Sequence, residues 1–328
     1  MPLEWIPDPG VFATYRDEWE RLRSADPEAT LFHTPRFLEL YWEELGEGTP
    51  LVAMVRQGEE PIGLCGFEVP DGVLSFLGGF EVTDYMGPVG RPEDRARVAQ
   101  ELLTGLAARD DWERADLEGL PEDGTWLGAL AGAAEAAGLA AEVAQDDVAP
   151  MLDLPATWEA YLARLKPKQR HEIRRKERRL RERFPDARLT RSSTESFEAD
   201  LDRFVEMHRA SEGPKGRFMS EDVEPFFRRL GRELLPEGIL RLVFLGGGGE
   251  KLAGLVAFRF EDTLLLYNSA FDPRHRAVAP GMVLASEIVK EAIGEGCTRL
   301  DMLKGDLGYK YRFGARPRPI RRLLLERR

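Results

Sequence analysis

Hydrophobic residues recur along this chain with two periods, and each period predicts one kind of element. Apolar residues spaced three and four apart over residues 13–25, 35–45 and 91–109 indicate helices with one buried face. Pro35 and Pro92 suit the first turn of the second and third of these helices, where a missing N–H is not needed. The first part of the chain is therefore predicted to hold three helices.

Short apolar runs divided by turn residues indicate strands between the second and third helices. The runs lie at Leu51–Arg56, Ile62–Val69 and Val73–Leu77, and the turn sequences QGEEP and PDG separate them. This spacing predicts an antiparallel meander. The strand-like sequence ADLEGL, at residues 115–120, follows the third helix.

The same order of elements returns in the second half of the chain. Strand-like runs at 239–245, 252–260 and 264–270 are followed by a predicted helix at 281–294 and a strand at 298–303. A right-handed crossover through the helix would place the last strand beside the third. The expected fold class is α/β, with a mixed sheet that occurs twice.

Identical residues at similar offsets support this internal repeat. PIGLCGFEV in the first half aligns with LAGLVAFRF in the second, and ADL aligns with LDM. The identical pairs are Gly63 and Gly254, Leu64 and Leu255, Phe67 and Phe258, and Asp116 and Asp301. We place the boundary near residue 150, which gives domains at 1–150 and 151–328.

The composition of the chain indicates its size class, its expected cellular compartment and the state of its cysteines. A chain of 328 residues, 43% hydrophobic and 32% charged, is large enough for two separate cores. It has no apolar run near the roughly 20 residues of a membrane-spanning helix, and its start lacks the order of a signal peptide, so we expect a cytoplasmic protein. Cys65 and Cys297 stand in apolar runs, which predicts buried, reduced thiols. The four histidines show no metal-ligand spacing, so no metal site is expected.

Charge is distributed unevenly along the chain. Residues 164–184 hold eleven Lys or Arg and three Glu, whereas the whole chain has a formal net charge of −12. The segment predicts a basic helix over 168–184 with Ile173, Leu180 and Phe184 on its buried stripe. Two interpretations of the excess positive charge stay open: an anion binds there, or the helix contacts the acidic N-terminal domain.

The sequence RHRAVAPG, at residues 274–281, opens the helix predicted at 281–294. This loop resembles the pyrophosphate-binding loop of the GNAT acyltransferase fold. The family pattern is Gln or Arg, two residues, Gly, one residue, and Gly or Ala. Arg276 and Gly281 match it, but Ala279 replaces the first glycine and Pro280 lacks an N–H donor. The resemblance implies that acyl-CoA is the co-substrate. The residues assigned to it are Arg274, Arg276, Ala279, Gly281, Asn268 and Ser269.

A longer set of motifs resembles the CelD-like branch, which pairs two GNAT units as the Fem-type peptidyl transferases do. In that branch the last strand and the loop after it carry an Asp, a basic residue with Gly-Asp, and Tyr-Lys. Here these residues are Asp301, Lys304, Gly305, Asp306, Tyr309 and Lys310, and Leu307 stands where an acidic residue is usual. The branch also has segments like KQRHEIRRKERRL, HRASEGPKG and TDYMGPV. The resemblance therefore implies two tandem GNAT-like domains over nearly the whole chain.

The same resemblance implies catalytic roles for Tyr309, Asp301 and Lys310. A phenol is protonated at neutral pH, so Tyr309 can give a proton to the leaving thiolate; ordinary aromatic packing is the alternative. A strand would turn Tyr309 and Tyr311 to one face, whereas a helical turn would separate them. Asp301 could orient the acceptor amine or accept a proton if burial raised its pKa, and a turn carboxylate is its alternative role.

The acceptor amine is expected to lie between the two domains. The residues assigned to it are Asp84, Tyr85, His208, Arg209, Lys215, Tyr267 and Asp306. Strand alternation predicts Tyr267 and Ser269 on one face of the sheet and Asn268 on the other. Glu81 and Asp84 would repel phosphate, so the first domain is expected to be a degenerate unit without CoA.

Three functions compete at this point. The first is an N-acyltransferase that moves an acyl group from acyl-CoA to a small or peptidic amine. The second is a Fem-type peptidyl transferase that uses aminoacyl-tRNA, which the acidic net charge disfavours. The third is a non-catalytic protein of polysaccharide or envelope assembly with a relict GNAT core, for which Ala279 and Leu307 argue.

Overall fold

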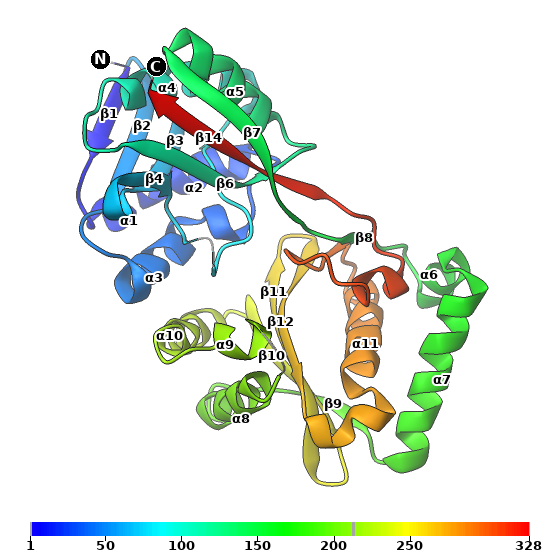
Figure 1. Cartoon of the computed structure of the whole chain (residues 1–328). Helices are drawn as coiled ribbons and strands as arrows, with labels where there is room; N and C mark the ends of the chain where they lie inside the picture. Colours follow the sequence, from blue (N-terminus) through cyan, green and yellow to red (C-terminus); the bar gives the residue numbers. More distant parts are fainter. Residues whose placement is uncertain (1, 80, 212–213, 328) are drawn as a thin grey trace. The chain divides into compact units, whose positions relative to one another are not determined.

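A computed structural model describes residues 2–79, 81–211 and 214–327, without the side chains of residues 214 and 215. The chain forms two compact units (Figure 1). The first unit comprises Met1–Val148 and Arg318–Arg328, and the second comprises Ala149–Pro317. Each unit has its own sheet.

The first unit is built on a sheet that runs in the order β1-β2-β3-β4-β6-β14-β7, with β5 paired to β3. Its strands are β1 (Leu3–Ile6), β2 (Leu51–Gln57), β3 (Glu60–Glu68), β4 (Val73–Phe76), β5 (Val89–Gly90), β6 (Arg114–Pro121), β7 (Leu139–Val148) and β14 (Pro319–Arg327). Its helices are α1 (Val11–Thr14), α2 (Arg16–Ala25), α3 (Pro35–Leu45), α4 (Arg95–Ala107) and α5 (Thr125–Ala136), with 3-10 turns η1 (Leu31–His33), η2 (Pro70–Gly72) and η3 (Pro92–Asp94). Pro35 opens α3 as predicted, and the Thr34 hydroxyl caps it by accepting from Phe37 N at 3.2 Å.

The second unit is built on a sheet in the order β8-β13-β12-β11-β10-β9. Its strands are β8 (Met151–Asp153), β9 (Arg188–Arg191), β10 (Leu240–Gly247), β11 (Glu250–Phe260), β12 (Thr263–Phe271) and β13 (Arg299–Asp301). Its helices are α6 (Trp158–Arg164), α7 (Pro167–Arg183), α8 (Phe197–Arg209), α9 (Pro214–Phe218), α10 (Glu224–Leu234) and α11 (Pro280–Gly294), with 3-10 turns η4 (Pro273–Val278) and η5 (Lys310–Phe313). Figure 1 shows α8 and α10 on one face of this sheet and α7 and α11 on the other.

The internal repeat predicted from the sequence is present in both units. Strands β2, β3 and β4 form an antiparallel meander, helix α4 follows, and β6 returns parallel to β4. Strands β10, β11 and β12, helix α11 and β13 repeat this arrangement. The α/β fold class with two mixed sheets is therefore confirmed.

The C-terminal strand differs from the predicted domain division. Residues 319–327 fall in the range 151–328 that we assign to the second domain, yet β14 pairs antiparallel with β6 and β7 of the first unit. Its residues Ile320, Leu323 and Leu325 are fully buried there. A terminal strand is apolar on one face in whichever sheet it joins, so its hydrophobic pattern does not predict which strands it pairs with.

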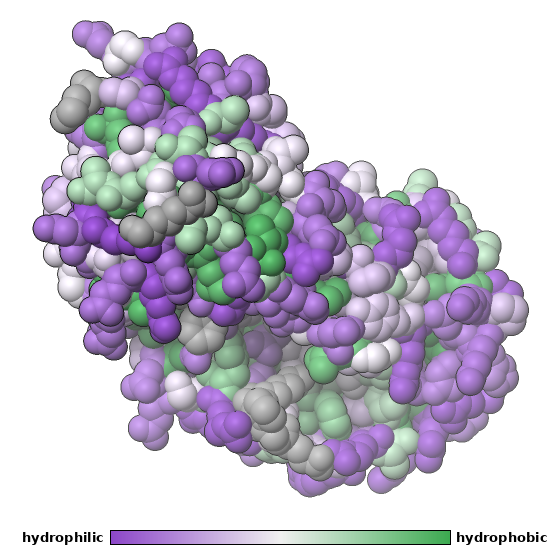
Figure 2. Space-filling model, turned by 45° about the horizontal axis from the view of Figure 1, so that its top comes forward, coloured by the Kyte–Doolittle hydropathy of each residue, from purple (hydrophilic) through white to green (hydrophobic). Residues whose placement is uncertain are grey.

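The basic helix of the sequence analysis is α7, and its predicted buried stripe is confirmed. Ile173, Leu180 and Phe184 are buried in the core of the second unit, where α7 packs against α11. Cys65 and Cys297 are buried and carry free thiols, also as predicted. Hydrophilic residues cover most of the surface visible in Figure 2. Within the described ranges, no helix has the length and apolar content needed to cross a bilayer.

Candidate functional site

The sheet of the second unit opens between two parallel strands. Strand β13 pairs with β12 at Arg299, Leu300 and Asp301, and β13 ends there. Strand β12 continues from Leu266 to Phe271, so this later part has no neighbour on the β13 side among the residues that form the sheet. An opening between parallel strands, beside a loop and a helix N-terminus, is a common place for a ligand.

A β-bulge lies in the part of β12 that borders this opening. The register with β11 shifts so that Val256 faces Asn268 while Ala257 faces Leu266, which leaves Tyr267 as the extra residue. Tyr267 packs against Phe227 of α10, with ring centroids 5.6 Å apart. Bulges often re-aim side chains next to active sites.

This bulge corrects the predicted alternation along β12. Asn268 also faces the helices, because its Oδ1 lies 2.8 Å from Nε2 of His208 on α8. Ser269 lies on the opposite face, where it hydrogen-bonds the Tyr309 side chain. Tyr267 and Asn268 thus share a face and Ser269 does not, because one extra residue shifts the two-residue period of the strand.

His208 positions Asn268 from within the core. Its ring is buried and lies 5.8 Å from the Phe204 ring and 6.0 Å from the Phe218 ring. Since an amide oxygen only accepts hydrogen bonds, the contact assigns the proton to Nε2 of His208. The neighbouring Arg209 donates to the Met219 carbonyl at 2.8 Å and pairs with Glu224 at 2.8 Å.

Tyr309 lies at the start of the turn η5, next to Ser269 on β12. Its ring packs against the core of the second unit, and burial raises the pKa of its phenol. The Tyr311 hydroxyl points elsewhere and donates to Asp306 Oδ1 at 2.5 Å in an exposed position. Of the two predicted arrangements, the helical turn that separates Tyr309 from Tyr311 is the one observed. Tyr309 therefore stays protonated at neutral pH beside the opening.

Asp301 and Lys310 contact the backbone of the loop that carries Tyr309. Asp301 Oδ1 accepts from Leu303 N at 2.8 Å, and Lys310 Nζ donates to the carbonyls of Leu303 and Lys304 at 2.8 Å each. Both side chains are buried, with 2% and 3% of their residues' surface exposed. Leu303 has a left-handed backbone with a φ of 56°. The two charged groups thus hold a strained turn, which corresponds to the turn-carboxylate alternative for Asp301.

The loop before α11 differs in part from the predicted phosphate site. The Arg274 side chain donates to Asp272 at 2.6 Å, and Arg203 donates to the same carboxylate at 2.6 Å. The Arg274 hydrogen bonds hold the pKa of Asp272 far below its usual range. Arg274 is thus engaged by Asp272 and does not converge with Arg276 on Gly281. Arg276 is exposed in the last turn of η4.

Ala279 has the backbone conformation for which glycine is best suited. Its φ and ψ are both 51°, and it forms the N-cap of α11. Glycine adopts this left-handed region without a steric penalty, which is a physical reason for the glycine in the family pattern. A Cβ at Gly281 would make only ordinary contact with Phe271, at 3.7 Å. The loop therefore keeps a helix-opening turn despite the departure at Ala279.

The N-terminal end of α7 borders a hollow of the second unit. This hollow has a volume of about 490 Å³ and is lined by Lys168, Gln169, Glu172, Gly308, Tyr311 and Arg312. Gln169 Nε2 donates to the Tyr311 carbonyl at 2.9 Å and so joins α7 to η5. Farther along α7, Glu177 accepts from Ser286 of α11 at 3.0 Å. The basic helix is thus attached to the helix that the candidate loop opens.

The residues assigned to the acceptor in the first unit are less accessible than predicted. Tyr85 is almost fully buried, and the Arg318 guanidinium lies 5.4 Å from its ring centroid. A tyrosine in this position supports the core and does not present its ring to a ligand. Asp84 is partly exposed, and the side chain of Lys215 lies outside the described residues.

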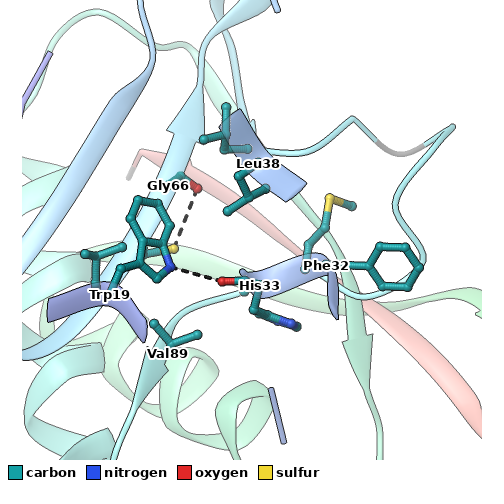
Figure 3. Close-up of a pocket in the computed structure, with 11 residues that line it drawn as sticks. Trp19, Phe32, His33, Leu38, Gly66 and Val89 are labelled. Atoms are coloured by element: carbon teal, nitrogen blue, oxygen red, sulfur yellow. Dashed lines mark hydrogen bonds between the residues drawn. The ribbon is translucent and has the colours of Figure 1, made fainter. Parts of the chain in front are cut away.

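A small cavity beside α2 and η1 belongs to the packed interior of the first unit (Figure 3). Its volume of about 10 Å³ has room for roughly one water molecule. Trp19 Nε1 donates to the His33 carbonyl at 3.0 Å. Burial lowers the pKa of His33 to about 4, so its ring is neutral near pH 7. No described side chain here is poised for chemistry.

Comparison with known proteins agrees with the fold. Residues 167–311 match a family model described as an acetyltransferase (GNAT) domain. The structure of FemX is similar with a TM-score of 0.65 and 12% identity over 93% of this chain and 95% of that one. A conserved protein of unknown function from Bacteroides thetaiotaomicron is similar over the full length of both chains, with a TM-score of 0.59 and 15% identity. A tandem GNAT protein from the clavulanic acid biosynthesis pathway has a TM-score of 0.53 and 14% identity over 98% of each chain. No curated protein matches the chain.

Proposed function

We propose that the second unit transfers an acyl group from acyl-CoA to the nitrogen of a small or peptidic amine. The match of residues 167–311 to a GNAT acetyltransferase domain is the premise. The observation that carries the proposal is the opening between β12 and β13, with a bulge at Tyr267 and a protonated Tyr309 beside it. Thioester aminolysis needs these parts: a slot for the acyl chain, backbone donors for the carbonyl and a proton for the thiolate.

In the proposed reaction, the amine nitrogen attacks the thioester carbonyl and the carbon–sulfur bond breaks. Backbone N–H groups at the unpaired edge of β12 stabilise the oxyanion. The Tyr309 phenol gives its proton to the leaving sulfur and regains one, through solvent, from the nitrogen that becomes the amide. The products are an N-acyl amine and CoA thiol, so atoms and charge balance. No covalent enzyme intermediate is required.

The remaining residues have supporting roles in this proposal. Asn268, which His208 orients, and Ser269, which bonds Tyr309, border the thioester. Arg276 and the backbone at Gly281 receive the CoA phosphates. Asp301 and Lys310 act as positioning residues that hold the loop before Tyr309. The acceptor-side assignments of Asp84, Arg209, Lys215, Tyr267 and Asp306 remain part of the proposal.

Calorimetric titration of the full chain with CoA and acetyl-CoA tests the donor assignment. We expect binding that Arg276→Glu weakens at least about tenfold, because a phosphate-facing cation becomes an anion. Arg188→Glu is the matched control, since Arg188 is an exposed residue of β9 at the far edge of the same sheet. Equal affinities for the wild type and Arg276→Glu would remove the loop from the donor site.

The basic helix supports a second candidate, an aminoacyl-tRNA-dependent transfer of the Fem type. Exposed cations follow the surface of α7 over its whole length: Lys168, Arg174, Arg178, Arg179, Arg181 and Arg183. Such a row suits a phosphate backbone. In this case tRNA binding should weaken steeply with salt, and CoA should not bind. Binding of CoA without tRNA would favour the first candidate.

A further inference from the structure

The first unit has an opening of its own at the equivalent step of the fold. Strand β6 pairs with β4 only at Arg114 and Ala115, and then continues to Pro121. Arg114 is equivalent to Arg299 of β13, so Asp116 is equivalent to Asp301. The two strands part after Ala115, as β12 and β13 do after Asp301. The repeat thus places a second potential ligand site in the first unit.

A hollow of about 670 Å³ lies at this opening, within the usual size range of small-molecule sites. Ser75 and Phe76 of β4 line it together with Asp116 and Glu118 of β6. Its apolar part is formed by Leu45, Val69, Phe76 and Met86. These apolar side chains can cover methylene groups of a ligand.

The charge of this hollow is opposite to what CoA would need. Its described lining includes five carboxylates and no lysine or arginine; the carboxylates are Glu47, Glu68, Asp71, Asp116 and Glu118. Arg322 of β14 is not among the lining residues; it pairs with Asp116 at 3.0 Å, with Glu118, and with Asp146 at 3.6 Å. One cation does not neutralise the remaining carboxylates, even though Glu68, with a pKa of about 7, is partly protonated near neutral pH. The phosphates of CoA would be repelled, whereas a cation would be attracted.

Two of the carboxylates, Asp116 and Glu68, are partly buried and have few hydrogen-bond donors, which a bound cation could supply. Asp116 Oδ1 is buried and has no hydrogen-bond partner among the described residues, although Oδ2 accepts from Arg322. Both oxygens of Glu68 accept from the single Tyr41 hydroxyl, at 3.1 and 3.2 Å, and the Gly79 backbone N–H is its other donor. Even so, burial raises the pKa of Glu68 to about 7. Buried acceptors without enough donors destabilise a fold unless a ligand supplies the donors.

The arrangement fits an organic cation better than a metal ion. Among the described residues, no three His, Cys, Asp or Glu side chains converge as a metal ion requires. The carboxylates are instead spread along the wall, from η2 and β3 to β6, beside an apolar surface. An elongated molecule with ammonium groups on a methylene chain matches both features.

We propose that this hollow of the first unit binds a primary ammonium group carried on an apolar chain, as in an aliphatic diamine. Ammonium N–H groups donate to Glu68 and Asp116, and the chain packs on Phe76 and Met86. This site goes beyond the acyl transfer proposed for the second unit and does not depend on it. In these proposals, the opening of the second unit binds an anionic ligand, and the equivalent opening of the first unit binds a cationic one.

Isothermal titration of the full chain with 1,5-diaminopentane tests the site, with 1,5-pentanediol as the uncharged probe. We expect the diamine to bind at least about tenfold more tightly than the diol, and less tightly as salt is raised. Glu68→Gln should weaken diamine binding about tenfold while Tyr41 still donates to the amide oxygen. The matched control is Glu142→Gln, an exposed residue of β7 in the same unit.

Each other outcome overturns the proposal. Equal diamine affinity in the wild type, Glu68→Gln and Asp116→Asn would show that the ligand binds elsewhere, and equal affinity for the diol would remove the role of charge. Loss of diamine binding in Arg276→Glu, with Glu68→Gln unaffected, would place the ligand in the second unit. Circular dichroism of each variant verifies folding. Failure of CoA to bind would contradict only the acyl transfer, so the two proposals fail separately.

Discussion

The two units open their sheets at the same step of the same topology, yet they surround the openings with opposite chemistry. In the second unit the strand β13 ends at Asp301, and the chain turns at Leu303 into a loop with a protonated Tyr309. In the first unit β6 continues and presents Asp116 and Glu118 to a hollow. The same topology therefore forms an opening in each unit, and the side chains at a few strand positions decide the charge around that opening.

The equivalent aspartates show how the difference arises. The Asp301 carboxylate accepts a backbone N–H two residues later, because the strand has ended and the chain turns back. The chain beyond Asp116 remains extended, so no local N–H is in reach, and Arg322 from β14 pairs with it. Asp301, which ends its strand, thus stabilises the loop that follows, whereas Asp116, which lies within its strand, lines the hollow of the first unit.

The largest expected effect concerns the chemistry of the second unit. If Tyr309 donates the proton, Tyr309→Phe should lower turnover about 10²-fold or more while acyl-CoA affinity changes less than about twofold. Tyr311→Phe is the matched control, because its hydroxyl bonds the exposed Asp306 and should matter little. Steady-state kinetics with a thiol-detecting assay measure both. Full turnover in Tyr309→Phe would assign the proton to water or another group.

The next largest expected effect is a loss of stability when the loop that follows β13 in the second unit is changed. Lys310→Met keeps the buried chain but leaves the Leu303 and Lys304 carbonyls without their ammonium donor, so we expect a loss of about 3 kcal/mol in stability. Lys290→Met, at an exposed position of α11, should change stability by less than about 0.5 kcal/mol. Hydrogen exchange of peptides from the second unit measures the loss. An unchanged exchange rate in residues 299–313 would contradict the role of Lys310.

A smaller effect distinguishes the acidic opening of the first unit. The pKa of Glu68 is raised from 4.5 to about 7, so the folded protein binds an extra proton between these values. The stability linked to this proton is present below pH 4.5 and is lost as pH rises through 7. Glu68→Gln should therefore be more stable than the wild type at pH 8, by about 2 kcal/mol, and similar to it at pH 4.5.

Thermal unfolding of both proteins from pH 4.5 to 8 measures this difference. Groups that face Glu68 are the Tyr41 hydroxyl, the Gly79 backbone N–H and the Glu47 carboxylate. Glu142→Gln should show no such dependence on pH. Diamine should reduce the gap at pH 8, because it binds the wild type more tightly and therefore stabilises it more than Glu68→Gln. A gap that does not depend on pH would contradict the cost assigned to the Glu68 carboxylate.

The sequence predicts those features of the two units that depend on the period of the hydrophobic residues. The repeat of three strands, a helix and a strand, the buried stripe of α7 and the start of α3 at Pro35 all follow from spacing. The bulge at Tyr267 does not, because one extra residue in a strand leaves no mark in an apolar run. It reversed the expected faces of Asn268 and Ser269.

The acidic hollow was also missed, for a different physical reason. Its carboxylates come from five places between Glu47 and Glu118, and in a chain with 58 acidic residues they form no motif. A signal exists only in the repeat, because Asp116 aligns with Asp301 and Glu118 follows it on the same face of the strand. Loop motifs, in contrast, keep their residues together in sequence, which is why the loop of the second unit with Asp301, Tyr309 and Lys310 could be proposed as a site from the sequence.

The smallest expected effect tests whether the loop before α11 still has the geometry of the phosphate-binding pattern. Ala279 is left-handed, a conformation that disfavours Ala relative to Gly. Ala279→Gly should therefore raise stability by about 0.5 kcal/mol, the balance of relieved strain against a more flexible unfolded chain. If CoA phosphates approach this turn, removal of the Cβ should also raise CoA affinity about twofold.

Ala277→Gly is the matched control for this change, and it should have the opposite sign. Ala277 lies within η4, two residues earlier, and its φ is not among the positive values of the chain. Glycine there adds flexibility and relieves no strain, so stability should fall by about 0.5–1 kcal/mol. Urea unfolding and CoA titration of the two variants measure both quantities. If both glycines lower stability and CoA affinity alike, Ala279 is not strained, and the conformational equivalence with the family's glycine is wrong.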